Sequence, residues 1–122
     1  MAGFVAKLGL AIGAIVSSPY ERAYATADIM ARHLNMTDKL VSDDRVVPGF
    51  DVGRLGDILQ DHPDAEALMF VGHEPDFSDV VGRLVGGRIV MKKGGIAYVE
   101  CTKASLEQAT LVWLVQPSIL GV

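Results

Sequence analysis

Ala67-Leu68-Met69-Phe70-Val71-Gly72-His73-Glu74-Pro75 is the most informative stretch of this chain. Its apolar start, residues 67–71, has the length of a fully buried strand, and Pro75 stands where a helix begins. We therefore predict that His73 follows the carboxyl end of a central strand. Ligands of open α/β sheets bind at that edge, so a titratable imidazole is well placed for chemistry there. The residues alone leave a second interpretation open, in which His73 caps the next helix or hydrogen-bonds a loop.

A second strand end lies earlier in the chain, where Ala14-Ile15-Val16 precedes Ser17-Ser18-Pro19-Tyr20-Glu21-Arg22-Ala23. We predict Ser18 as a helix N-cap and Pro19 as the first helical residue. Arg22 then falls in the first turn, where the helix dipole disfavours a cation, and a bound anion such as phosphate would relieve that conflict. The alternative is that Arg22 pairs with Glu21 or with another surface acid.

Together these two motifs resemble those of the histidine phosphatase superfamily, whose members have the phosphoglycerate mutase-like fold. More narrowly they resemble the bacterial phosphohistidine phosphatases of the SixA type. The resemblance covers essentially the whole chain. It rests on Ser17-Ser18-Pro19 with Arg22-Ala23 and Thr26, on Val71-Gly72-His73-Glu74-Pro75, on Val47-Pro48 with Asp51-Val52, on Lys92-Lys93-Gly94-Gly95-Ile96-Ala97 and on Val112-Trp113-Leu114-Val115-Gln116-Pro117.

The resemblance implies an α/β three-layer sandwich whose mostly parallel sheet is flanked by helices. It also implies phosphoryl transfer through a covalent phosphohistidine, without metal or cofactor. Arg22 corresponds to a phosphate-binding residue of the family, and His73 to its second, catalytic and phosphate-binding histidine. Asp51 is a possible proton donor, although its position favours a helix N-cap. Thr26 is expected to pack the helix, and Glu74 to orient His73 or to cap the following helix.

The family's nucleophile is missing from this chain. Relatives open with a strand that ends in Arg-His-Gly, and no such motif is present. His33 lies in a helical pattern and His62 precedes Pro63 in an acidic turn, so we expect both to face solvent. Met1 resembles an internal methionine. We therefore expect an N-terminally truncated single domain over residues 1–122, inactive as it stands, with roughly forty in-frame residues encoded upstream.

Three functional interpretations follow from the resemblance and stay open. The first is a phosphatase acting on a phosphohistidine of a protein such as a phosphorelay domain. The second is a phosphatase of a small phosphorylated metabolite. The third is a non-catalytic relative that binds anions or a partner protein. Because the family's nucleophile strand lies inside its sheet, we also expect an exposed sheet edge at the strand ending at Gly72 and a possible homo-oligomer through it.

Composition narrows the classes of partner. Among 122 residues, 50% are hydrophobic, which fits a parallel sheet covered on both faces. The net charge of −4 argues against nucleic acid as a partner. The single cysteine, Cys101, cannot form an intrachain disulfide, so we expect a structural thiol and a cytoplasmic location. The apolar segment at 4–16 is too short to span a membrane, so no membrane partner is expected.

The remaining pattern alternates strands and helices, as crossover units do. Strands are expected near 12–17, 45–47 and 66–71. Helices are expected near 1–9, 20–35, 51–60 and 76–85, the last ended by Gly86-Gly87. Strands near 95–102 and 109–115, joined by residues 103–108, suit an antiparallel hairpin.

Overall fold

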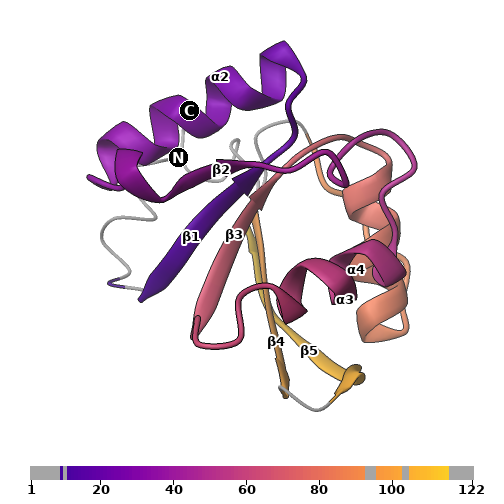
Figure 1. Cartoon of the computed structure of the whole chain (residues 1–122). Helices are drawn as coiled ribbons and strands as arrows, with labels where there is room; N and C mark the ends of the chain where they lie inside the picture. The colour runs from indigo at the N-terminus through magenta and orange to yellow at the C-terminus, as the bar shows by residue number, and fades with distance from the viewer. Residues whose placement is uncertain (1–8, 10, 93–95, 103–104, 116–122) are drawn as a thin grey trace.

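The computed structural model describes residues 9, 11–92, 96–102 and 105–115. These residues form two sheets and three α-helices (Figure 1). In chain order the elements are β1 (Ile12–Ser17), α2 (Glu21–His33), a 3₁₀ turn (Thr37–Lys39), β2 (Leu40–Ser42), α3 (Val52–Gln60), β3 (Ala67–Val71), α4 (Asp76–Val85), β4 (Ile96–Thr102) and β5 (Ser105–Val115).

The first sheet is parallel, and helices cover both of its faces. Its strand order is β2-β1-β3, with Val16 aligned between Val41 and Phe70. Successive side chains of β1 point to opposite faces, so neighbouring residues enter different cores. Ile15 packs beneath α2, whereas Val16 packs on the side of α3 and α4 (Figure 1). The prediction of an α/β fold with a parallel sheet flanked by helices is confirmed.

The sheet has a hydrophobic core on each face, and each helix contributes the apolar side chains of one of its faces to a core. The α2 core contains the buried residues Ile15, Ala27, Met30 and Ala31. The core on the other face contains the buried residues Val16, Val46, Phe50, Leu55, Ile58 and Val80. The helix expected at 76–85 is confirmed, and it ends at Gly86, whose φ of 71° is the left-handed conformation that glycine adopts without strain.

The second sheet is the predicted antiparallel hairpin. Ile96 aligns with Val115 and Tyr98 with Trp113. β5 begins at Ser105, four residues before its expected start, so the predicted connection over 103–108 is too long. β5 packs against α4.

Two expectations about strands are wrong. The strand ending at Val71 is not central: β1 lies in the middle of the parallel sheet, and among the described strands β3 pairs with β1 alone. Nor do residues 45–47 form a strand. The backbone N–H of Val46 donates to the carbonyl of Asp43, which closes a turn, and the short strand lies earlier, at β2. The helix expected near 1–9 lies outside the described residues apart from Gly9.

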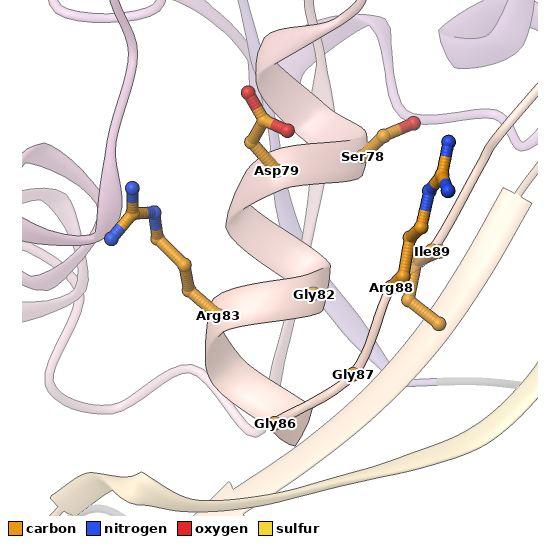
Figure 2. Close-up of a pocket in the computed structure, with 8 residues that line it drawn as sticks. All are labelled: Ser78, Asp79, Gly82, Arg83, Gly86, Gly87, Arg88 and Ile89. Atoms are coloured by element: carbon orange, nitrogen blue, oxygen red, sulfur yellow. The ribbon is translucent and has the colours of Figure 1, made fainter.

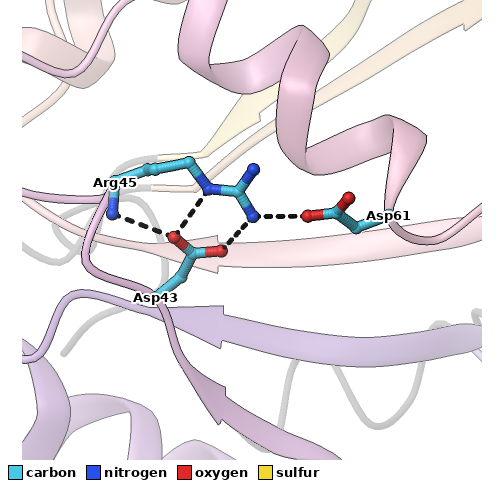
Figure 3. A network of polar contacts seen from close by, with 3 residues as sticks. All are labelled: Asp43, Arg45 and Asp61. Atoms are coloured by element: carbon cyan, nitrogen blue, oxygen red, sulfur yellow. Dashed lines mark hydrogen bonds and ion pairs between the residues drawn. The ribbon is translucent and has the colours of Figure 1, made fainter.

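An ion-pair network holds this turn in place (Figure 3). The backbone N–H and the Nε of Arg45 both donate to Oδ1 of Asp43, each at 2.9 Å. Nη2 of Arg45 donates to Oδ2 of Asp43 at 2.8 Å and to Oδ2 of Asp61 at 2.6 Å. The hydrogen bond from the Arg45 side chain is the main cause that lowers the pKa of Asp43. The network therefore ties the loop after β2 to the end of α3.

Gly72, directly after β3, is required by packing. A Cβ at this position would lie 2.6 Å from two ring atoms of Phe77 and 3.0 Å from Cγ1 of Val46. The Phe77 ring packs against Phe50, with ring centroids 5.4 Å apart, so it has little room to move. The glycine thus lets the first turn of α4 lie directly against the end of β3.

We predict that Asp43→Asn destabilises the protein by about 1 kcal/mol at neutral pH, the upper end for exposed ion pairs. A carboxyl whose pKa is lower in the folded than in the unfolded state stabilises the fold above its unfolded pKa of about 3.9. That contribution disappears as the pH falls through the folded-state pKa. Urea unfolding at neutral and acidic pH should therefore show a gap between variant and wild type that narrows on acidification.

Asp28→Asn is the matched control, because Asp28 forms an exposed ion pair with Arg32 within α2 at 2.6 Å. It should cost no more than about 0.5 kcal/mol. Equal losses in the two variants would contradict a structural role for the Asp43 network.

We predict that Gly72→Ala destabilises the protein by roughly 1–3 kcal/mol, because the added methyl overpacks the contact with Phe77. Gly53→Ala is the control, since its Cβ would meet only Oδ1 of Asp51 at an ordinary 3.5 Å. In the first turns of α3 that change should be neutral or stabilise by up to about 1 kcal/mol. Thermal unfolding checks both, and a neutral Gly72→Ala would show that the Phe77 ring moves aside freely.

Candidate functional site

One peptide group at the carboxyl edge of the parallel sheet anchors the site. The carbonyl of Ser17 accepts from the backbone N–H of Asp43 at 2.9 Å, on the β2 side. The N–H of Ser18, in the same peptide group, donates to the carbonyl of Val71 at 2.9 Å, on the β3 side. Ser17 and Ser18 are both fully buried. The chain leaving β1 is thus fixed to both neighbouring strands just before α2 begins.

Ser18 links the two predicted motifs directly. Its Oγ lies 2.7 Å from Nε2 of His73, 55 residues later in the chain. The same Oγ accepts a hydrogen bond from the backbone N–H of Tyr20 at 3.1 Å. The Tyr20 ring meets the imidazole edge to face, with centroids 5.1 Å apart and planes at 62°. The imidazole of His73 is therefore held beside the start of α2.

The backbone of His73 takes part in the start of α4, but its imidazole ring does not cap that helix. The carbonyl of His73 accepts from the N–H of Phe77 at 3.1 Å, as a first helical turn requires. Pro75 is the N-cap residue of α4, and Glu74 before it supplies an acceptor for the first turn: its carboxylate accepts from the backbone N–H of Ser78 at 3.2 Å and from the Ser78 hydroxyl. The capping role expected of Glu74 is confirmed, and the His73 ring is left for the contact with Ser18.

The start of α2 differs from the prediction. Tyr20 is the N-cap residue and Glu21 the first helical residue, so Ser18 is not the N-cap and Pro19 lies outside the helix. The physical reason is that the Ser18 hydroxyl is already engaged with Tyr20 and His73. The side chain of Tyr20 makes no capping hydrogen bond. Within the part of the chain that the structure describes, the first N–H groups of α2 have no side-chain acceptor.

Arg22 lies in the first turn of α2, as predicted, and is exposed. Its expected alternative, an ion pair with Glu21 or another acid, is absent from the ion pairs of the described residues, which involve Arg32 and Arg45. Thr26 does not pack the helix: it is exposed, and its Oγ1 donates to the carbonyl of Arg22 at 3.0 Å. Arg22 thus forms no ion pair with another described residue.

Asp51 is the N-cap of α3, as its position favoured. Its Oδ1 accepts from the N–H of Arg54 at 2.9 Å. Its role as a proton donor remains a prediction. Cys101 lies in β4, and its side chain is outside the described residues.

Neither of the other two histidines directly follows a strand of the parallel sheet. His33 ends α2 and is exposed, as expected. Since α2 has 13 residues, His33 is about 18 Å along the helix from its start. His62 follows Asp61, the C-cap residue of α3, and is half-buried rather than solvent-facing; its charge is one of the lesser causes that lower the pKa of Asp43.

A hollow along α4 is separate from this edge (Figure 2). Its lining consists of Ser78, Asp79, Gly82, Arg83, Gly86, Gly87, Arg88 and Ile89. Figure 2 shows Arg83 and Arg88 on opposite sides of the helix, so their guanidinium groups do not converge on one ligand. The hollow contains neither Arg22 nor His73, and we place the candidate site at the carboxyl edge of the sheet.

Sequence reasoning identified His73 and Arg22 but missed Ser18 and Tyr20 as partners of the imidazole. The sequence signal for Ser18 as a site residue was its position directly after a strand, but the same position also suits a helix N-cap. Nothing in the sequence indicates the contact of Tyr20. Within the described ranges, no group of three or more His, Cys, Asp or Glu residues is placed to hold a metal ion, and no helix has the length and apolar character needed to cross a membrane.

Comparison with known proteins supports the fold. No family model matches the sequence. No curated protein matches it either. Among solved structures, the protein histidine phosphatase SixA complexed with tungstate is similar, with a TM-score of 0.85 and 21% sequence identity. The match covers 98% of this chain and 78% of that one. The chain therefore has the α/β fold of SixA, as the resemblance of its motifs predicted.

Proposed function

We propose that this chain binds the phosphoryl group of a phosphohistidine at the carboxyl edge of its parallel sheet, as part of a phosphohistidine phosphatase-type site. Arg22 and the first turn of α2 bind the phosphoryl oxygens, and His73 donates a further hydrogen bond. The observation that carries the proposal is the contact between Ser18 and His73, which holds the imidazole beside a helix start whose N-cap residue, Tyr20, makes no side-chain cap.

The charges at this edge suit a tetrahedral oxyanion. The free N–H groups of α2 and the positive end of its dipole attract an anion, and a guanidinium adds a bidentate donor. A hydrogen bond to a charged group contributes roughly 1.5–3 kcal/mol. Glu21, in the same turn, opposes part of this attraction. We therefore expect a weak site rather than a tight one. The similar SixA structure holds tungstate, an anion of this shape.

Binding is supported better than turnover. Phosphoryl transfer of this type needs a second imidazole in line with the phosphorus atom. This chain has three histidines, and neither of the two besides His73 directly follows a strand of the parallel sheet, because His33 ends α2 and His62 comes after α3. We propose that the chain as given does not hydrolyse phosphohistidine, and that it supplies phosphate-binding groups only.

A protein-borne phosphohistidine is the favoured ligand. Arg22 is exposed and Tyr20 is 53% exposed, so the site lies open at the surface. A phosphorylated side chain projecting from another protein can reach such a site, whereas a small metabolite usually binds in an enclosed cleft. The single cysteine fits a reducing compartment, and we propose a cytoplasmic location. A small phosphorylated metabolite remains the second candidate ligand.

We predict that tungstate binds at millimolar or weaker affinity, and that Arg22→Ala weakens binding roughly 10- to 150-fold, the value of one charged hydrogen bond. Arg32→Ala is the control, because Arg32 is an exposed arginine in the last turn of the same helix. Chemical-shift titration of the backbone amides of α2 measures both. Equal effects of the two variants would show non-specific charge attraction and overturn the proposed site.

The same samples test turnover. Incubation with a phosphohistidine peptide should release no phosphate above the level of a His73→Ala variant. Hydrolysis that disappears in His73→Ala would show that the chain is a complete enzyme. Binding of tungstate but not of any phosphohistidine peptide would favour the non-catalytic anion-binding alternative.

We further propose that the outer edge of β3 pairs with a second copy of the chain. The two sheets are separate, and β3 has one strand partner among the described residues. All five of its residues are half-buried, whereas Ile15 and Val16 of β1 are fully buried. An open, apolar strand edge favours pairing with another chain.

We predict a dimer in sedimentation equilibrium at micromolar concentration. Met69→Lys is a poor test because Met69 packs in the α2 core. Replacing Leu68 by proline instead removes a strand N–H and should shift the protein toward monomer. Thr110→Pro in the hairpin is the control, since it also removes a strand N–H but lies in the other sheet. A wild-type monomer that unfolds cooperatively would contradict the proposal.

A further inference from the structure

We propose that Ser18 holds the neutral imidazole of His73 in the tautomer protonated at Nδ1, so that His73 always presents an N–H donor to a bound anion. The effect of this tautomer on anion binding rests on the proposed function. The tautomer itself depends only on the hydrogen bonds of the buried Ser18 hydroxyl, and it can be tested without any ligand.

The Ser18 hydroxyl determines which nitrogen of His73 carries the proton. Ser18 is fully buried, so its hydroxyl hydrogen cannot be given to solvent. One lone pair of Oγ already accepts the N–H of Tyr20 at 3.1 Å. Among the described residues, Nε2 of His73, at 2.7 Å, is the acceptor within reach of that hydrogen. A neutral imidazole that accepts at Nε2 must carry its hydrogen at Nδ1.

The opposite tautomer leaves a buried donor without a partner. If Nε2 carried the hydrogen, Oγ of Ser18 would accept from both Tyr20 and His73. The hydroxyl hydrogen would then have no acceptor in a buried position, which is unfavourable. The peptide N–H of Ser18 is itself bonded to Val71, so the serine cannot easily move to find another partner.

The edge contact with Tyr20 fixes the remaining freedom of the ring. The planes of the two rings lie at 62°. This edge-to-face packing limits how far the imidazole can rotate while it keeps its hydrogen bond to Oγ of Ser18. With Nε2 engaged, Nδ1 is the nitrogen left for a ligand. A hydrogen there makes His73 a donor to phosphoryl oxygens, and it removes the lone pair that nucleophilic attack from Nδ1 would need. Ser18 is thus a positioning residue that assigns His73 to binding.

The test is a long-range ¹H–¹⁵N correlation spectrum of protein labelled at histidine, recorded without ligand about two pH units above the ordinary histidine pKa of about 6.5. We expect His73 to show the Nδ1–H pattern, while His33 serves as an exposed internal reference. Ser18→Ala should shift His73 toward the Nε2–H tautomer that free histidine prefers. Ser17→Ala is the control, because that buried hydroxyl donates to the Ser18 carbonyl instead.

An Nε2–H pattern for His73 in the wild-type protein would overturn the inference, even if Ser18→Ala failed to fold. A tungstate titration at the same pH separates this outcome from failure of the proposed function. We expect Ser18→Ala to weaken tungstate binding roughly tenfold and Ser17→Ala to leave it unchanged. Absence of tungstate binding in the wild type would overturn the proposed function while leaving the tautomer assignment intact.

Discussion

The peptide group between Ser17 and Ser18 is the point on which the architecture depends. Its carbonyl is bonded to the chain leaving β2 and its N–H to the last residue of β3. A single rigid, planar unit therefore sets the relative position of three strand ends. Because α2 starts three residues later, the same unit also places the first turn of that helix at the edge of the sheet.

This constraint explains how two distant motifs form one site. His73 follows β3 by two residues and Ser18 follows β1 by one, so the parallel pairing of the strands brings both residues to the same edge. The 2.7 Å contact between them is possible because Gly72 has no side chain to separate β3 from α4. The hydrogen-bonding chemistry of the site thus rests on strand register and on one glycine.

Much of the fold followed from local patterns. The apolar run of β3, the Asp51 cap and the Gly86 stop each act through interactions within a few residues, and each appears as expected. The failures have a different origin. Residues 45–47 have strand-like side chains, yet the bidentate contact between Arg45 and Asp43 turns the chain there. Ser18 has the character of a cap, yet a residue 55 positions away competes for its hydroxyl.

The sequence by itself determined the α/β class and most helix and strand types, and it indicated the two residues, Arg22 and His73, on which the proposed anion site rests. Those features depend on periodicity, capping and side-chain type, which are properties of short segments and do not require contacts with distant residues. Only the tertiary structure decided that β1 rather than β3 is central, that Tyr20 and Ser18 hold the imidazole, and that the second sheet stands apart from the first. These depend on which distant groups satisfy each buried donor and acceptor, and no local pattern encodes that choice.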